Sequence, residues 1–362
     1  MRIPTFSLLA VLALLAAACG GGTTDTTSPD STTSTLAEPA PEAVVLSYGL
    51  EPGTSFSYEV DMDQAIDLMT SGDPTAMGED EIPAQMSLQI SGTSTLTHTI
   101  SEGPEPGTFE VNITGDFSNL EFSGTIDGEP VEEAEIPDIA ELDPIDVTVI
   151  VDEQGNVIPE DEALGEDFLG GLGGLGGLDM LGQIGAAGSA GQFVGPPLSD
   201  EEVTVGDTWS ETIETPTLPD DDPITTLIES EVVGTDSVDG AEVFIIETTT
   251  TTSPIEFDLA ELLLGLMSAF MPEEASEEER AEIDAIADEI RFAFSVDETV
   301  SEMTTWFDHE AGLSRRAEFS NSTHMVMDMN VPDEATGELV GLEMDMGISQ
   351  DISYRLTDSS GP

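Results

Sequence analysis

The sequence predicts a mainly β protein of the α+β class, built on a large antiparallel curved sheet or half-barrel, either single or duplicated, with a few helices covering one apolar face. Three observations lead to this fold. Consecutive runs alternate apolar and polar residues with a period of two, which is typical of an antiparallel sheet covered on one face. Short motifs of the N-terminal half return later in the chain, and two later stretches carry helix patterns. The pattern leaves open whether the two halves form one sheet or two domains.

The first β-rich half is expected at residues 44–164. Its strands each have an apolar and a polar face, and turn residues such as Asp127-Gly128 separate them. The predicted strands are Phe56–Met62, Met86–Ile90, Phe109–Thr114, Asn119–Ile126 and Val147–Val151.

Residues 165–198 interrupt this pattern with twelve glycines and with leucines at every third position from Leu169 to Leu181. A helix would drift off that spacing, and each glycine costs a helix about 1 kcal/mol relative to alanine. We interpret the segment as a flexible linker between two halves. A second interpretation is a leucine-edged flap that touches lipid or closes a pocket.

The second half, residues 199–357, repeats motifs of the first and is followed by a tail at 358–362. The segment at 206–213 aligns with 53–60 at an offset of 153 residues, and the identities are few. Two further pairs are Gly240–Glu247 with Gly107–Val111, and Trp306–Gly312 with Ile150–Gly155. These pairs predict two related half-sheets.

Two helices are expected in this half, near 258–271 and 276–292. Asp258 can cap the first helix, which is apolar nearly all round, and Pro272 stops it. At about 1.5 Å per residue it spans roughly 20 Å, too short to cross a bilayer. Ser276 and Glu279 form a capping box for the second helix. Its predicted apolar stripe is Ile283, Ile286, Ala287, Ile290 and Phe294.

Methionines concentrate in the last strands, at His324–Met329 and Leu342–Met346. If the two segments pair as a hairpin, their methionines form one patch. We expect Met325, Met327, Met329, Met344 and Met346 to line a ligand site, because flexible thioether side chains adapt to irregular apolar ligands. The same residues could instead pack as core beneath the first helix. With His324 they could also offer soft ligands to Cu(I).

The N-terminus predicts where the protein works. Arg2 is followed by an apolar run from Leu8 to Ala18 that ends in alanines directly before Cys19, the only cysteine. This stretch resembles bacterial lipoprotein signal peptides, although Ala16 stands where such signals more often carry leucine. The resemblance implies a signal peptide at 1–18, acylation of Cys19, a flexible tether at 19–43 and a lipid-anchored protein on the extracytoplasmic face of the cell membrane.

Charge excludes several classes of function. The chain has 76 acidic residues and six arginines, no lysine, and a formal net charge of -70. Such a surface repels nucleic acids and anionic lipid head groups, whose binding requires Lys and Arg. We therefore predict no nucleic-acid partner. A single cysteine also excludes an internal disulfide.

No catalytic, metal or cofactor motif stands out, so we predict a non-enzymatic protein without a cofactor or a specific metal site. His98, His309 and His324 are scattered, no glycine-rich loop leads to a lysine, and the ligand spacing of an EF-hand is absent.

A lipidated signal, a long antiparallel sheet, late helices and the segment from Trp306 through Leu313 to Arg316 resemble the half-barrel lipoproteins similar to LolA and LppX. The chain also resembles acidic actinobacterial lipoproteins of unknown function. The half-barrel resemblance implies a protein that holds a lipid between a curved sheet and its helices. The expected function is non-catalytic binding of an apolar or lipid-like ligand in the cell envelope. The alternative is a structural or protein-binding envelope module, with protein partners that the sequence does not identify.

Overall fold

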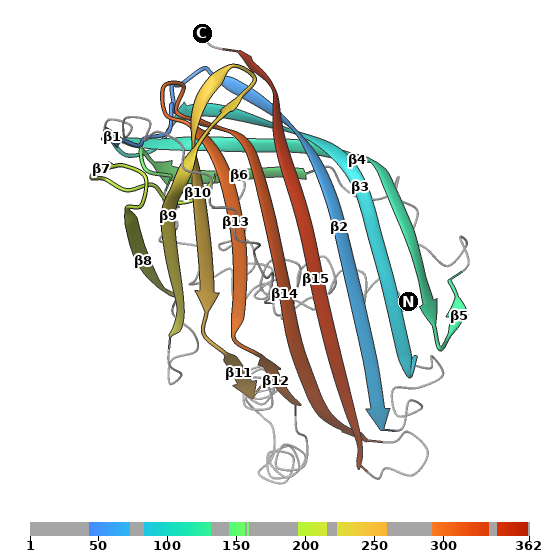
Figure 1. The fold of residues 1–362 in the computed structure, drawn as a ribbon. Helices are drawn as coiled ribbons and strands as arrows, with labels where there is room; N and C mark the ends of the chain where they lie inside the picture. The colour runs from blue at the N-terminus through green and yellow to red at the C-terminus, as the bar shows by residue number, and fades with distance from the viewer. Residues whose placement is uncertain are drawn as a thin grey trace, which may run out of the picture.

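The computed structural model describes residues 43–72, 83–131, 145–155, 158, 195–215, 223–258, 292–332 and 339–360. All regular secondary structure in this part of the chain is β-strand, and all strands but two belong to one antiparallel sheet (Figure 1). The strands are β1 (Val44–Val45), β2 (Ser55–Gly72), β3 (Gln85–Glu102), β4 (Thr108–Ile126), β5 (Glu129–Pro130), β6 (Ile145–Asp152), β7 (Glu202–Val203), β8 (Thr208–Thr215), β9 (Ile224–Val238), β10 (Ala241–Thr252), β11 (Ile255–Asp258), β12 (Phe292–Val296), β13 (Thr299–Asp308), β14 (Leu313–Pro332) and β15 (Leu339–Ser360).

The large sheet joins both halves of the chain. Its strand order is β5-β4-β3-β2-β15-β14-β13-β10-β9-β8, with β6 also paired to β4, and β12 paired to β11 and β14. Strands of the first half follow one another along one side of the sheet, strands of the second half follow one another along the other side, and the β2–β15 pair connects them. The predicted antiparallel curved sheet is confirmed, and the two halves form one continuous sheet.

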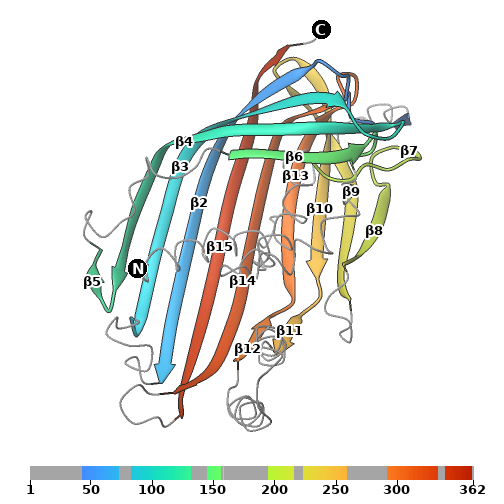
Figure 2. The same ribbon diagram turned by 180° about the vertical axis from the view of Figure 1, so that it is seen from behind.

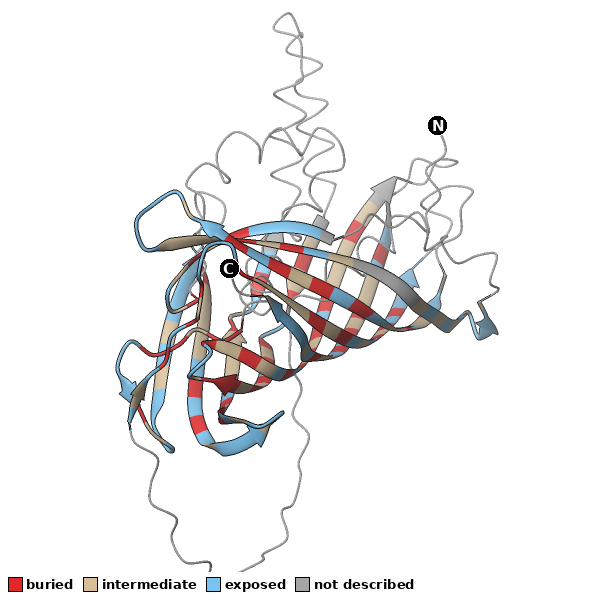
Figure 3. Cartoon of the chain, turned by 90° about the horizontal axis from the view of Figure 1, so that it is seen from above, coloured by how far each residue is buried: buried red, intermediate tan, exposed pale blue. Residues whose placement is uncertain are grey.

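Buried and more exposed residues alternate along the strands (Figure 3), so the sheet has two different faces. On the central strands β2, β15, β14 and β13, the register places one set of alternating residues on the same face, and none of them is charged. We call this the inner face, and the opposite one the outer face. The inner positions are the even-numbered residues from Phe56 to Thr70 and from Leu342 to Leu356, and the odd-numbered residues from Ala317 to Met329 and from Thr299 to Phe307.

The inner face closes on itself at one end of the sheet. One buried cluster contains Ile113 and Val151 of β4 and β6 together with Ile246 and Phe307 of β10 and β13. The strands β3, β2, β15 and β14 separate these groups in the sheet order, so they touch only because the sheet curls with its inner face concave. Figure 2 shows β4 and β6 crossing the upper parts of β13 and β10. This closing cluster comprises Leu46, Tyr48, Leu50, Ile100, Val111, Ile113, Val149, Val151, Leu198, Val203, Val232, Phe244, Ile246 and Phe307.

Two segments outside the large sheet fill the closed end. The Tyr48 ring packs edge-on against Phe307, with ring centroids 5.4 Å apart. Its hydroxyl donates a hydrogen bond of 2.8 Å to the carbonyl oxygen of Pro196. Strand β1 pairs with β7, which ties the segment before β2 to the segment before β8. Both halves of the chain therefore contribute side chains and backbone to the closed end of the sheet.

The repeated motifs form equivalent turns. In each aligned pair a glycine adopts a positive φ angle, which side chains other than glycine rarely tolerate. The φ values are 92° and 95° for Gly53 and Gly206, 86° and 85° for Gly107 and Gly240, and 84° and 65° for Gly155 and Gly312.

Hydrogen bonds at these turns also correspond. The N–H of Gly53 donates to the carbonyl of Ile100 at 2.9 Å, and the N–H of Gly206 donates to the carbonyl of Val232 at 2.7 Å. After β6 the carboxylate of Asp152 accepts the N–H two residues later at 2.9 Å, and Asp308 after β13 does the same at 3.1 Å. The geometry supports a duplication in which β2, β3, β4 and β6 correspond to β8, β9, β10 and β13.

The ends of the two predicted helices are strands. Asp258 ends β11 and pairs with Ala293, and Phe292 begins β12. Phe294, which we placed on a helical stripe, lies on β12 opposite Met327, so that placement is wrong. The remainder of both predicted helices, the predicted signal peptide, Cys19, the predicted tether through residue 42 and residues 165–194 of the predicted linker lie outside the described residues. Among the described residues, no helix is long and apolar enough to cross a membrane.

Replacing Phe307 with alanine should destabilise the protein by about 3–5 kcal/mol, because its side chain is 0% exposed and the closing cluster cannot refill its volume. Ile213→Ala is the control, since Ile213 is 44% exposed and should cost less than about 1 kcal/mol. Urea unfolding followed by the fluorescence of Trp209 and Trp306 measures both. Equal midpoints for Phe307→Ala and the unmodified protein would contradict the role of the cluster.

Candidate functional site

The five predicted methionines lie together on the inner face. Met325 is opposite Met346, Met327 is opposite Met344, and Met329 is opposite Leu342, so the predicted hairpin is confirmed. Met325, Met329 and Met346 are buried, and the other two are half-buried. The Met patch, defined as Met325, Met327, Met329, Met344 and Met346, lies at the end of β14 and β15 away from the closing cluster.

Aliphatic and aromatic side chains extend the Met patch over neighbouring strands. Leu68 of β2 lies opposite Met346, and Phe294 of β12 lies opposite Met327. The result is a broad apolar surface on the concave side of the sheet. The buried members of this cluster are Ile66, Leu68, Met86, Ile90, Ile224, Ile255, Phe294, Val296, Met325, Met346 and Ile348.

A row of polar side chains crosses the inner face between the Met patch and the closing cluster. Gln64 of β2 lies opposite Gln350 of β15, which lies opposite Asn321 of β14, and Asn321 lies opposite Ser301 of β13. Their exposed fractions are 3% for Gln64, 7% for Gln350, 5% for Asn321 and 6% for Ser301. Burial of such a group without a hydrogen bond costs about 1–3 kcal/mol. We call these four residues the polar row.

Hydroxyl groups continue the polar row toward β9. Thr250 is the register partner of Ser301, and the hydroxyls of Ser230 and Thr248 form a hydrogen bond of 2.9 Å. Thr226 and Thr252 approach within 3.3 Å. The inner face is therefore apolar over β2, β14 and β15 near the Met patch and hydroxyl-rich over β9 and β10.

His98 lies on the inner face near the closing cluster. Its ring contacts Tyr58 at a centroid distance of 5.1 Å, and burial lowers the pKa of His98 to about 4, so the ring is neutral at physiological pH. A cavity of about 10 Å³ between Tyr48, His98 and Ser314 is about the size of one water molecule. His98 therefore contributes no positive charge to the inner face.

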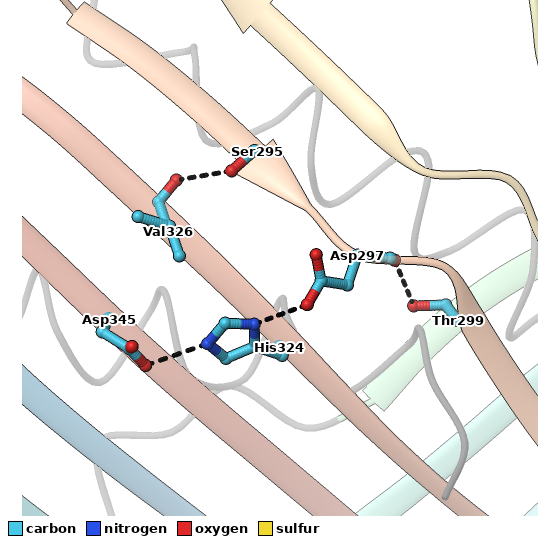
Figure 4. Close-up of polar contacts among 6 residues, drawn as sticks. All are labelled: Ser295, Asp297, Thr299, His324, Val326 and Asp345. Carbon is cyan, nitrogen blue, oxygen red and sulfur yellow. Dashed lines mark hydrogen bonds and ion pairs between the residues drawn. The ribbon is translucent and has the colours of Figure 1, made fainter.

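His324 lies on the outer face, opposite to the face of the Met patch. Figure 4 shows its ring between Asp297 and Asp345. Its Nδ1 is 2.7 Å from a carboxylate oxygen of Asp297, and its Nε2 is 3.0 Å from Asp345. The hydrogen bond to Asp297 raises the pKa of His324 above its usual value, and the bond to Asp345 adds to this effect against a lowering by burial. Because successive strand residues face opposite sides, His324 cannot join Met325 and Met327 around a copper ion.

Charged groups occupy the outer face. Among the described residues, Arg316 pairs with Glu318 and stacks over Trp306 at 4.5 Å, and Arg355 pairs with Glu59 at 2.7 Å. An open hollow of about 370 Å³ on the outer face is lined mainly by carboxylates and hydroxyls of β2, β13, β14 and β15. No group of three or more His, Cys, Asp or Glu side chains in the described part of the chain is arranged to hold a metal ion.

Sequence reasoning found the Met patch and missed the polar row. A signal for it was present, because Gln64 and Gln350 interrupt apolar positions of strict period-two runs. Their meeting depends on the register between β2 and β15, which joins the two ends of the described chain.

No family model and no curated protein matches the chain. Among solved structures, lipovitellin, from a structure described as showing lipid–protein interactions, is 12% identical in sequence to this chain, with a TM-score of 0.31. The match covers 86% of this chain and 26% of the lipovitellin chain. A DUF1329 family protein from Desulfovibrio piger is 8% identical with a TM-score of 0.11, covering 82% of this chain and 85% of its own. An outer membrane channel from Pseudomonas putida F1 is 7% identical with a TM-score of 0.17, covering 86% and 97%. This chain spans about a quarter of the length of the lipovitellin chain. At these TM-scores none of the likenesses supports a conclusion about function.

The carboxylates around His324 should make stability depend on pH. A histidine whose pKa is raised by folding contributes stability fully below its ordinary pKa of about 6.5, and this contribution is lost as pH rises through the raised value. The melting temperature of the unmodified protein should therefore fall toward that of His324→Gln between about pH 6 and pH 9. Thermal melts of both proteins across this range measure the difference. If the difference in melting temperature between the two proteins stays constant with pH, the contacts of His324 with Asp297 and Asp345 are refuted.

Proposed function

We propose that the protein is a membrane-anchored extracytoplasmic lipoprotein that binds an apolar or lipid-like ligand on its inner face without catalysing a reaction. The observation that carries this proposal is the Met patch within a concave face whose central strands bear no charge. The alternative is a structural or protein-binding envelope module without a small-molecule ligand.

The Met patch suits a flexible apolar ligand. Methionine side chains are unbranched and polarizable, so they rearrange around irregular shapes at little cost. Each methylene group that an acyl chain buries there would contribute about 0.8 kcal/mol. The surrounding Ile, Leu and Phe side chains extend this apolar contact over β2, β3, β12, β14 and β15.

A binding role also fits the uncharged inner positions of the four central strands. General acid–base and nucleophilic catalysis require a titratable group beside the reacting atoms. The inner positions of β2, β13, β14 and β15 carry only apolar, hydroxyl and amide side chains. Membrane attachment is proposed from the N-terminal sequence, in which Cys19 follows an apolar run and small residues.

The double variant Met327→Glu, Met344→Glu should bind a fluorescent long-chain acyl probe at least about tenfold more weakly than the unmodified protein. The reason is that the two new carboxylates would lose their water when the acyl chain of the probe packs against them. Fluorescence titration of the purified full-length protein measures the affinity. Met69→Glu is a matched control on the outer face, where Met69 is 56% exposed, and it should bind as the unmodified protein does.

Native mass spectrometry of the detergent-extracted protein provides a second readout, in which a bound lipid should add to the protein mass. Equal loss of binding in the control and the double variant would contradict the role of the Met patch. A protein without bound lipid that crosslinks to another protein in cells would favour the structural or protein-binding alternative.

Replacing Cys19 with serine should abolish incorporation of a labelled fatty acid and release the protein from the membrane fraction. The reason is that the thiol of Cys19 is the only one in the chain and would carry the first acyl group. Metabolic labelling with a clickable palmitate and cell fractionation measure both effects. Unmodified protein recovered in the cytosol with an intact leader and a free thiol would refute the anchor.

A further inference from the structure

The inner face has an internal polarity that an alkyl chain alone does not explain. The polar row lies four residues from the Met patch along β15, between Met346 and Gln350, which corresponds to about 13 Å at roughly 3.3 Å per residue. A ligand that covers both regions is therefore amphipathic. Its chain would contact the methionines and its head would contact the amides.

The polar row offers both donors and acceptors. A glutamine or asparagine side chain has two N–H donors and an oxygen with two acceptor positions. Gln64 and Asn321 already take part in polar interactions, and their amides retain capacity for more. The hydroxyls of Thr323 and Thr305, on the same face of β14 and β13, are buried and have no hydrogen-bond partner among the described residues.

Among the described residues, no unpaired positive charge lies near the polar row. The chain contains no lysine, and among the described residues the three arginines pair with carboxylates, namely Arg315 with Asp308, Arg316 with Glu318 and Arg355 with Glu59. The neutral ring of His98 supplies no cation either. The described residues would therefore give a phosphate or carboxylate head no counter-charge for the water that it loses on the inner face, in a protein of net charge -70.

We propose that the polar row binds the uncharged head of an acyl lipid, one that presents hydroxyl and ester groups, while the acyl chain lies on the Met patch. Gln64, Gln350 and Asn321 donate N–H groups to ester or hydroxyl oxygens and accept hydroxyl hydrogens, and Thr323 adds a hydroxyl. This inference rests on the proposed function and specifies its ligand class as an acylglycerol or a neutral glycolipid.

A series of fluorescent probes that share one acyl chain tests the head group. The heads are glycerol ester, glucosyl, phosphate, and a methyl ester without hydroxyls. Titration of the purified full-length protein should give an affinity for the glycerol ester or glucosyl probe at least about tenfold above that for the phosphate probe. The better of these two probes identifies which uncharged head is bound. A phosphate probe that binds as tightly as both would overturn the inference.

The double variant Gln64→Leu, Gln350→Leu tests the residues. It should lose about tenfold in affinity for the hydroxyl-bearing probes and little for the methyl ester. Gln89→Leu is a matched control, because Gln89 is exposed on the outer face of β3 and should leave all affinities unchanged. Unchanged selectivity in the double variant would overturn the role of the row.

The two proposals fail in different ways. If no probe binds the unmodified protein, the proposed lipid-binding function fails. If all probes bind equally, that function stands and the head-group inference is wrong. The selectivity of the unmodified protein gives this answer even if the double variant does not fold.

Discussion

The contact between the two sides of the sheet in the closing cluster determines which face of every long strand becomes the inside. Ile113 and Val151 belong to one side and Ile246 and Phe307 to the other, and the curl that brings them together makes their common face concave. A one-residue slip in any central strand would turn its apolar set outward and its carboxylates inward. The cluster and the alternation therefore depend on each other, and the Met patch and the polar row exist only in this register.

The two halves of the sheet cover each other at the closed end. Each half is a meander with one apolar face, and such a face needs a cover. In the closing cluster, Val111 of the first half and Phe244 of the second pack within the same core, so each copy covers the other. Among the described residues of the first half, no hairpin corresponds to β14–β15. Strands of both halves thus build the closed end, and β14 and β15 supply the Met patch.

The local part of this architecture follows from sequence. Period-two runs give the strands, Asp127-Gly128 gives a turn with φ values of 52° and 83°, and adjacent methionine runs give the hairpin. Register between distant strands does not follow, and so the closing cluster and the polar row were missed. Phe294 shows the same limit, since a spacing of four from Ile290 fits a helix, yet pairing with Met327 makes it a strand residue. Cross-strand pairing outweighed a weak local preference.

The charge distribution ties curvature to ligand chemistry. Carboxylates repel one another on the outer face, and bending that face convex moves them apart, so self-repulsion favours the direction of curl that the closing cluster also requires. A charge on the inner face would oppose the same bend, which accounts for the uncharged inner positions of β2, β13, β14 and β15. In the resulting molecule, the uncharged inner positions of the central strands lie within a negative field. That field disfavours the approach of anionic ligands over any route across the outer face, whereas an uncharged amphiphile meets no such barrier and finds amides, hydroxyls and methionines in sequence along one strand pair.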